Sequence, residues 1–306
     1  GPGGAPSGRL QGVEQEGEKT MGKIVIVGSG PAGCSAALYA ARAGQEVVVI
    51  SMGMGALSKA ELIQNYYGFE EGITGAELYR RGVAGAKAVG AEFITAEVVG
   101  LDYTGSLVVQ TTEGDYPADA VILATGTGRI APKIAGLAEH EGRGVSYCAT
   151  CDAFFYRGKT AAVLGSGEYA LHEVQALLPL AGKVILCTNG EPLTADFPEG
   201  VEICTEKLAA VEGEEKVSAL RLENGELLPV EGLFVALGVA GSAALARKLG
   251  APVENGRIVV DEKMQTGIPG LYAAGDCTGG LLQVCKAVYE GALAATEAIK
   301  QIRGKK

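Results

Sequence analysis

The chain has 306 residues, of which 47% are hydrophobic and 20% are charged, and its formal net charge is −10 at pH 7. This length supports two domains of ordinary size, and the negative charge argues against general binding to nucleic acid or to an anionic membrane, because both depend on basic patches. No apolar run approaches the roughly 20 residues of a transmembrane helix. Seven cysteines without a recognisable secretory signal favour cytosolic redox chemistry over a disulfide framework, so we expect a cytoplasmic protein.

The N-terminal region contains a leader and then a nucleotide-binding pattern. Residues 1–20 lack an apolar core and are interpreted as a disordered leader or tag. Residues 23–50 predict a strand, a glycine turn, an alanine-rich helix and a second strand. In this turn Gly28 makes the tight bend, Gly30 lets the backbone approach a pyrophosphate, and Gly33 allows close packing of helix and strand. We therefore predict a dinucleotide site, with the helix N-terminus facing the anion.

One feature of the usual dinucleotide pattern is missing. The second strand ends in the letters VVVISMG and carries no Asp or Glu at its tip, the residue that usually binds a ribose hydroxyl. Ribose recognition is therefore expected from another part of the chain, or this detail of the site differs. A glycine turn without a ligand is the alternative interpretation, and the flanking strand and helix favour a binding site over it.

The next segments continue the alternation of strands and helices. Residues 75–90 predict a helix, and the segments 91–103, 106–112 and 116–126 predict antiparallel strands that return to a sheet. A second strand, turn, helix and strand begin at Lys159, with the glycine turn GSGEYA. This repeat is typical of a nucleotide-binding architecture. The C-terminal region, with AAGDC and an apolar helical segment, is expected to return to the first domain.

A pair of cysteines precedes the second repeat. Cys148 and Cys151 stand in the segment YCATCDAFFYRGK. This spacing on a helical turn can close a small disulfide ring, and such surroundings often lower the pKa of one thiol so that a thiolate is available for exchange. The adjacent Asp152 can deliver a proton to a leaving thiolate and later recover it.

Half of a zinc site is the competing interpretation of this pair. Zinc needs about four ligands, and no second CxxC follows in the chain. Cys187 and Cys204 are far apart in the sequence, and His140 and His172 are the only histidines. We therefore expect a redox pair and no metal site.

The segment CATCDAFFYRGK resembles the redox motif of low-molecular-weight thioredoxin reductases of bacteria. Further similarity extends from Lys23 to the C-terminal helix and includes GSGPAG, GALSKAELIQNYYGF, ATG and AAGDC. The resemblance implies an α/β, two-domain FAD/NAD(P)-binding fold with tandem Rossmann-like domains. In it, residues 21–129 and 251–306 form the FAD-binding domain, and residues 130–250 form an inserted redox domain. It also implies a homodimer and a domain rotation, because one dithiol must face the flavin and then an external protein.

The resemblance also assigns residues to the FAD site. Asn65 matches an asparagine near the flavin, and Asp276 matches the carboxylate that holds the ribityl chain. Gln283 and Val284 lie where the family starts a helix beside the flavin ring, at a place where it usually has Arg-Gln. The expected FAD-binding residues are Gly28, Gly30, Pro31, Ala32, Gly33, Leu57, Asn65, Ala124, Thr125, Gly126, Gly275, Asp276, Gln283 and Val284.

The mechanism implied by the resemblance is electron transfer from FAD to the disulfide, followed by exchange with thioredoxin or a thioredoxin-like protein. Cys151 is the expected flavin-proximal sulfur and Asp152 the acid–base group, while the choice of the thiol that attacks the partner stays open. The other cysteines near the expected flavin site are interpreted as small buried residues, namely Cys34, Cys277 and Cys285.

The inserted domain departs from the family where NADPH would bind. Members that use NADPH have an arginine-rich HRRxxxR cluster after the next strand, because a 2′-phosphate needs charge-assisted partners. Residues 184–200 contain no Arg or Lys and include Glu191, Asp196 and Glu199. Glu168 and the bulky Tyr169 in the second glycine turn argue against NADH as well, and favour a turn that only packs the domain.

This departure resembles the branch of ferredoxin-dependent flavin thioredoxin reductases, so we expect reduced ferredoxin as the electron donor. The alternatives are a diflavin disulfide oxidoreductase with another donor, an NAD(P)H-dependent thioredoxin reductase, and a flavin-binding redox sensor without turnover. Arg80, Arg81 and Lys87 are a candidate basic patch for an acidic ferredoxin, although most such charges are merely solvated.

Overall fold

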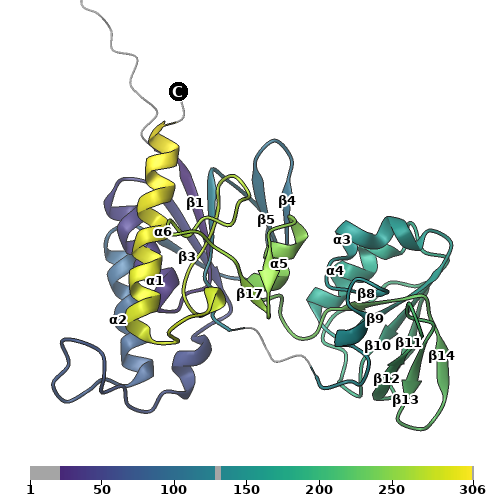
Figure 1. Cartoon of the computed structure of the whole chain (residues 1–306). Coiled ribbons are helices and arrows are strands. Elements are labelled where there is room, and N and C mark those ends of the chain that lie inside the picture. Colours follow the sequence, from purple (N-terminus) through teal and green to yellow (C-terminus); the bar gives the residue numbers. More distant parts are fainter. Residues whose placement is uncertain (1–20, 128–131, 305–306) are drawn as a thin grey trace, which may run out of the picture.

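The computed structural model describes residues 21–127 and 132–304. Figure 1 shows two bodies side by side, one formed by the N-terminal and C-terminal segments and the other by the middle of the chain. The expected leader and the predicted domain boundary near residue 130 lie outside the described residues. Within the described part of the chain, no helix has the length and apolar character needed to cross a membrane.

The first body is built on a parallel sheet with the strand order β18-β7-β1-β2-β3. Its central strands are continuous apolar runs, KIVIV in β1 and EVVVIS in β2, as expected for strands buried on both faces. Helices α1 and α6 pack against each other, and their alanine-rich stripes share a core with one face of this sheet. The bounds are β1 Lys23–Val27, β2 Glu46–Ser51, β3 Glu92–Thr95, β7 Ala120–Leu123, β18 Leu271–Ala273, α1 Pro31–Arg42, α2 Gly75–Ala88 and α6 Val284–Gly304.

A separate antiparallel sheet, β4-β5-β6, is formed by Val98–Tyr103, Leu107–Thr111 and Gly114–Ala118. The prediction of antiparallel strands is therefore right for these segments and wrong for β3 and β7, which pair in parallel with β2 and β1. Alternation along a segment identifies a strand and its faces, whereas it carries no information about the partner strand. The full burial of AVIL in β7 is the signal of a central parallel strand.

The second body repeats this plan with a parallel sheet of order β11-β10-β9-β15-β8 and an antiparallel sheet β12-β13-β14. Helix α4 connects β9 to β10, so the predicted tandem Rossmann-like units are confirmed. The bounds are β8 Val145–Ser146, β9 Thr160–Leu164, β10 Lys183–Cys187, β11 Val201–Cys204, β12 Leu208–Glu212, β13 Ala219–Leu222, β14 Leu227–Pro229, β15 Gly232–Val235, α3 Ala149–Asp152 and α4 Glu168–Leu177.

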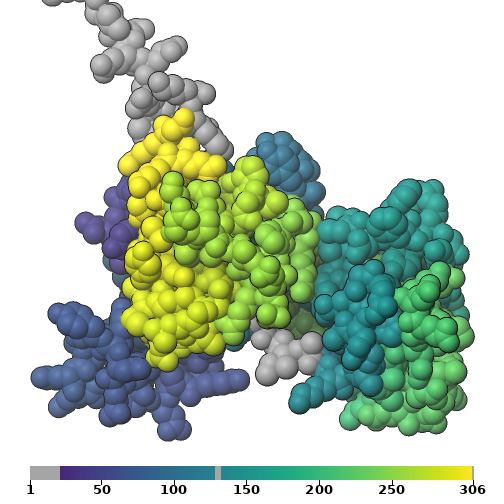
Figure 2. All heavy atoms as spheres, in the orientation of Figure 1, coloured from purple at the N-terminus to yellow at the C-terminus, as the bar shows by residue number. Residues whose placement is uncertain are grey.

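Helix α5 lies where the chain passes back to the first body, and it packs against β4, β16 and β17 (Figure 1). One apolar cluster continues from the core of the first sheet through α5 into the second body. In Figure 2 the C-terminal helix (yellow) and the segment before it (light green) lie across the front of the first body, and the second body stands beside them. The predicted domain boundary near residue 250 stays a prediction. The remaining bounds are α5 Ser242–Lys248, β16 Val253–Glu254, β17 Arg257–Ile258, and the 3-10 segments η1 Gly55–Lys59, η2 Ala138–His140, η3 Ala153–Tyr156 and η4 Asp276–Thr278.

Candidate active site

The first glycine turn joins β1 to α1 and leaves open space above its middle glycine. Gly28 has φ +111°, which glycine adopts readily, and a Cβ there would overlap the Ala124 carbonyl. A Cβ at Gly33 would overlap the Gly28 carbonyl, so the close approach of helix and turn requires glycine. Apart from Gly30 and its two neighbours in the chain, no described residue has an atom within 4 Å of the position that a Cβ of Gly30 would take. A pyrophosphate can therefore approach the N-terminus of α1 at this point.

A cavity of about 690 Å³ extends from this turn. That volume is within the range of about 300–1,000 Å³ that is typical of ligand sites. The cavity is lined by the expected residues Gly28, Gly30, Pro31, Ala32, Leu57, Asn65, Ala124, Thr125, Gly126, Gly275, Asp276, Gln283 and Val284. Gly33 lies behind them, against the turn. The cavity and the open glycine turn fit FAD, and the contact of each residue with the cofactor stays a prediction.

Two side chains of α6 brace the loop that carries Asp276. The Lys286 ammonium donates to the Gly275 carbonyl at 2.8 Å and to the Thr278 hydroxyl at 2.9 Å. The Glu290 carboxylate lies 3.0 Å from that ammonium and accepts the Gly275 N–H at 3.0 Å. Sequence reasoning missed this pair, although opposite charges four positions apart in a helix are a known signal.

Two further contacts join distant parts of the cavity wall. The Asn65 side-chain amide donates to the Gln283 side-chain oxygen at 3.0 Å. At the tip of β2, the hydroxyl of Ser51 lies 2.6 Å from that of Ser29. Ser51 lines the cavity at the place where the usual pattern has an acidic residue, so a hydroxyl stands there in place of a carboxylate.

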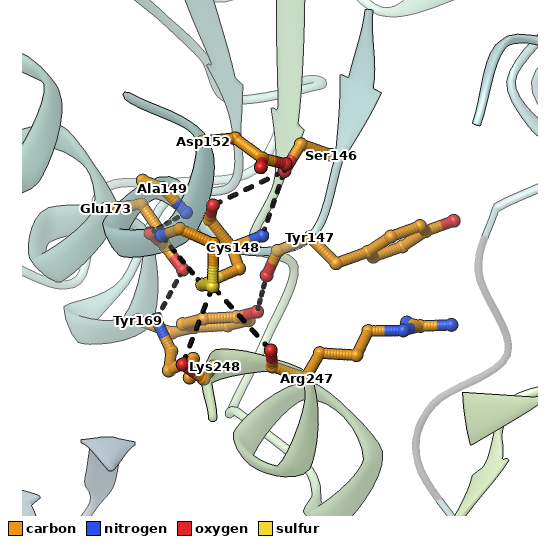
Figure 3. Close-up of a disulfide and its surroundings, with 10 residues drawn as sticks. Ser146, Tyr147, Cys148, Ala149, Asp152, Tyr169, Glu173, Arg247 and Lys248 are labelled. Atoms are coloured by element: carbon orange, nitrogen blue, oxygen red, sulfur yellow. Dashed lines mark hydrogen bonds and ion pairs between the residues drawn. A yellow bond between two sulfur atoms is a disulfide. The ribbon is translucent and has the colours of Figure 1, made fainter. Parts of the chain in front are cut away.

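Figure 3 shows the redox turn, in which Cys148 and Cys151 form a disulfide with Cα atoms 5.3 Å apart. Cys148 caps α3, and its sulfur accepts the Cys151 N–H at 3.2 Å. The Ser146 hydroxyl donates to the Asp152 carboxylate at 2.6 Å and accepts the Cys148 N–H at 3.1 Å. The predicted disulfide on a helical turn is confirmed, and Asp152 is tied to it through a serine that sequence reasoning missed.

A buried ion pair connects the redox turn to α5 (Figure 3). The Lys248 ammonium lies 2.7 Å from the Glu173 carboxylate, and each side chain is 1% exposed. The other Glu173 oxygen accepts the N–H of Ala149, between the two cysteines, at 2.9 Å. The ring of Tyr169, expected beside the second glycine turn, instead lies 5.7 Å from the Lys248 ammonium. Because α4 and α5 pack on different sheets, this pair fixes the two bodies to each other.

The disulfide faces α5 in this conformation. The Cys151 sulfur lies 3.5 Å from the Lys248 carbonyl oxygen and 3.6 Å from that of Arg247. The Arg247 guanidinium lies 4.3 Å from the centre of the Tyr147 ring. Cys148 is only 5% exposed, and neither cysteine is among the residues that line the cofactor cavity. The disulfide therefore contacts α5 through the Cys151 sulfur, keeps Cys151 exposed as a residue, and is separate from the cavity.

Two titratable groups between the bodies have shifted pKa values. Burial, together with the nearby Lys248 cation, lowers the pKa of His172 to about 4. The His172 ring packs against the backbone of Gly100 in β4. Burial also raises the pKa of Glu97, and repulsion from Glu168 of the second body adds to this shift.

Glu173 had a signal in the sequence that was missed. It lies on the buried stripe of α4 with Ala170, Val174 and Leu177, where an acid needs a buried partner. The partner itself had no local signal, because Lys248 follows 75 positions later and belongs to another helix.

The unpaired cysteines near the cavity differ in exposure. Cys34 and Cys277 are buried, as predicted, and burial raises the pKa of each thiol to about 12. The prediction of a buried residue is wrong for Cys285, which is exposed. Cys285 lies outside the buried stripe of α6, which runs through Ala287 and Ala294.

The second glycine turn is covered. The Thr194 N–H donates to the Ser166 carbonyl at 2.9 Å, so the loop after β10 folds over the turn. A Cβ at Gly167, the counterpart of Gly30, would lie 3.0 Å from the Thr194 hydroxyl. Glu168 follows as the first residue of α4. An anion at this helix N-terminus would meet a loop and a carboxylate.

Comparison with known proteins agrees with this geometry. The profile of the family described as pyridine nucleotide-disulphide oxidoreductase matches residues 22–291. A thioredoxin reductase from Aquifex aeolicus (strain VF5) is 35% identical over 307 residues, which cover 92% of this chain and 94% of the relative.

Two solved structures are similar to this chain over most of its length. The atypical thioredoxin reductase TRi from Desulfovibrio vulgaris Hildenborough is 41% identical with a TM-score of 0.87, over 92% of this chain and 98% of that chain. A ferredoxin-flavin thioredoxin reductase from Clostridium acetobutylicum is 36% identical with a TM-score of 0.70, over 93% of this chain and 99% of that chain. The chain therefore belongs to the pyridine nucleotide-disulphide oxidoreductase family, as an FAD-binding member of its low-molecular-weight thioredoxin reductase group.

Proposed function

We propose that this protein is a flavin-dependent disulfide reductase that passes electrons through Cys148 and Cys151 to thioredoxin or a thioredoxin-like protein, with reduced ferredoxin as the donor. The observation that carries the choice of donor is the covered second glycine turn, where Thr194 occupies the space that Gly30 leaves open in the first. The similarity to a ferredoxin-flavin thioredoxin reductase supports the same choice.

Electrostatics also disfavour a pyridine nucleotide at the second turn. Residues 184–200 contain no cation, and Glu168 stands at the N-terminus of α4. A nucleotide phosphate would meet negative charge there, without the guanidinium groups that bind a 2′-phosphate. A ferredoxin transfers its electron from a docked position and needs no such turn. Arg80 and Arg81 both pair with Glu77, so we assign the docking surface elsewhere.

The residues around the disulfide position its sulfur atoms and can transfer the protons of the reaction. Bound FAD supplies two electrons, and two protons complete the conversion of the disulfide to two thiols. The Cys151 N–H already donates to the Cys148 sulfur and would stabilise a thiolate on that atom. Asp152, oriented by the Ser146 hydroxyl, is the group we assign to proton transfer at the pair.

Turnover requires the two bodies to separate. Cys148 is buried and the Cys151 sulfur contacts α5, so a partner protein cannot reach the Cys148 sulfur in this conformation. The pair also lies away from the cofactor cavity. We infer a rotation of the bodies, which must break the ion pair between Lys248 and Glu173.

The proposed function is tested by anaerobic titration of the flavin absorbance with NADPH, NADH and reduced ferredoxin in turn. We expect reduced ferredoxin to bleach the flavin, oxidised thioredoxin to restore its colour, and NADPH to have little effect. Full and rapid bleaching by NADPH or NADH would refute the choice of donor. The Cys148→Ser variant should still be bleached while failing to reduce thioredoxin, and retained thioredoxin reduction would refute the role of the pair.

A further inference from the structure

Cys187 and Cys204 lie side by side at the carboxyl edge of the second body's parallel sheet. Each is the last residue of its strand, and the strand register pairs them across β10 and β11. Neighbouring strands are about 4.8 Å apart, a separation within the range of about 4.4–6.8 Å between the Cα atoms of disulfides. The two thiols are far apart in the sequence, and the sheet makes them neighbours.

The two thiols have different surroundings. Cys187 is fully buried in an apolar cluster, and the partly exposed Cys204 packs against the same cluster. A hydrogen bond from the Cys187 thiol, together with one from the Glu206 N–H, lowers the pKa of Cys204 to about 6, against the opposing effect of its burial. The same thiol–thiol hydrogen bond, followed by burial, raises the pKa of Cys187. At neutral pH the pair therefore holds one thiolate next to one thiol.

We propose that Cys187 and Cys204 are a second redox-active thiol pair, which small-molecule disulfides oxidise to an intramolecular disulfide. Cys204 is the attacking sulfur because it is the partly exposed member, and the buried Cys187 resolves the product. This pair goes beyond the proposed function, because its chemistry uses neither the cofactor cavity nor the Cys148–Cys151 disulfide.

The reaction consists of two thiol–disulfide exchanges. The Cys204 thiolate attacks one sulfur of the small disulfide, a bond forms between these sulfurs, and the first small thiolate leaves. The Cys187 sulfur then attacks the Cys204 sulfur, and the second small thiolate leaves with the proton of Cys187. The two cysteines are oxidised by two electrons in total, and the small disulfide is reduced to two thiols.

The position of the pair connects its oxidation state to the covered turn. The Gly165 N–H of that turn donates to the Cys187 carbonyl at 3.0 Å, and the Thr188 N–H donates to the Cys204 carbonyl at 3.0 Å. Strand β11 is the edge strand of the sheet, held by its neighbour β10. A disulfide at this point fastens the edge strand to β10 beside the place where other proteins of this fold bind a nucleotide.

The proposal is tested in the Cys148→Ser/Cys151→Ser variant, which keeps only the second pair and the lone cysteines. The protein is incubated anaerobically with glutathione disulfide, quenched in acid, alkylated, digested and analysed by mass spectrometry. We expect a peptide pair linked through Cys187 and Cys204. Adding Cys204→Ser should abolish the linkage, and adding Cys187→Ala should stop the reaction at a glutathione adduct on Cys204.

The exposed Cys285 provides the matched control. Cys285→Ser should leave the linkage unchanged, because this exposed thiol lies on α6 of the first body and is not part of the strand pair β10–β11. At a glutathione disulfide concentration that modifies Cys285, Cys187 and Cys204 should no longer be available for alkylation. If both are still recovered as alkylated thiols, the proposal is overturned. A linkage of Cys204 to any other cysteine would also overturn it.

A second measurement uses the chain with its redox disulfide intact. The rate of Cys204 alkylation by iodoacetamide should follow a titration with a midpoint near pH 6. In Cys187→Ala the midpoint should move toward the ordinary cysteine value of about 8.5, because the hydrogen-bond donor is gone. A midpoint near 8.5 in the unmodified chain would overturn the assignment of Cys204 as the attacking thiolate.

Discussion

Replacing Lys248 with methionine removes the cation from the buried pair that joins the two bodies. The variant keeps most of the side-chain volume, and it leaves the Glu173 carboxylate, 1% exposed, without the ammonium that lies 2.7 Å from it. The carboxylate still accepts the N–H of Ala149, so its charge stays beside the redox turn. We expect Lys248→Met to favour the separated arrangement of the bodies, in which water can solvate Glu173.

The size of this effect follows from the burial of the pair. Removal of one partner of a buried ion pair costs about 3–5 kcal/mol, because it leaves an uncompensated charge. Separation of the bodies relieves this cost, so the docked arrangement should lose about 3 kcal/mol relative to the separated one. Since about 1.4 kcal/mol corresponds to a factor of ten, the ratio of the two populations should change by roughly a hundredfold.

The assay is the rate at which a water-soluble phosphine reduces the Cys148–Cys151 disulfide. Cys148 is 5% exposed and the Cys151 sulfur lies against α5, so separation of the bodies should uncover more of the two sulfurs for the reagent. We expect the rate to rise in Lys248→Met, by at most about a hundredfold, because access to the buried Cys148 sulfur follows the separated population.

Two control variants separate electrostatics from packing. Lys248→Met combined with Glu173→Gln removes both charges, keeps an acceptor for the Ala149 N–H, and should return most of the way to the original rate. Lys300→Met removes an ammonium that is 69% exposed and lies 3.2 Å from Glu297, a contact of little energetic value. Equal rates in Lys248→Met and Lys300→Met would refute the reasoning. A double variant as fast as the single one would show that the unpaired charge is not the cause.

Two further predictions concern pH and the glycine turns. Burial lowers the pKa of His172 to about 4 in the docked arrangement, whereas a solvated histidine titrates near 6.5. Docking of the two bodies should therefore be strongest above about pH 6.5. It should weaken by up to roughly 3 kcal/mol as the pH falls toward about 4, because the separated arrangement binds the proton more readily. The rate of phosphine reduction, measured relative to that of a free disulfide, should rise as the pH falls through this range. The measurement is made in a Glu97→Gln variant, because the raised pKa of Glu97 has the opposite effect on docking. A rate that does not change with pH in this variant would contradict the prediction. Gly30→Val fills the open space of the first turn and should weaken FAD binding at least about tenfold. The measurement is the amount of flavin bound per chain, and the Tm of the apoprotein should not fall. The matched Gly167→Val should leave FAD binding unchanged, and equal losses in both variants would contradict the assignment of the first turn.

Local patterns identified much of the chemistry in advance. The glycine at 33 is required by the carbonyl of Gly28 within the same turn, and the spacing of Gly28, Gly30 and Gly33 predicted that turn. The disulfide closes a ring of adjacent residues on one helical turn, and CxxC predicts it for the same reason. Ser146, by contrast, reaches Asp152 through the strand before the turn and had no motif of its own.

Strand partners were the weakest part of the prediction. The segments that become β3 and β7 were identified as strands, while their parallel pairing was missed, because pairing depends on where the crossover helices return the chain. The sequence also did not predict that Thr194 covers the second glycine turn. The absence of basic residues after β10 had nevertheless already argued against a nucleotide at that turn.

The sequence by itself determined the fold class, the disulfide between Cys148 and Cys151 and the family of the protein, because each depends on residues a few positions apart or on a pattern shared along the whole chain. Only the tertiary structure decided that Lys248 neutralises Glu173 behind the redox turn, and that Cys187 meets Cys204 at a sheet edge. Both contacts depend on how separate helices and strands pack against one another. Spacing along the chain carries no record of that packing, since burial and register act between segments that are distant in sequence.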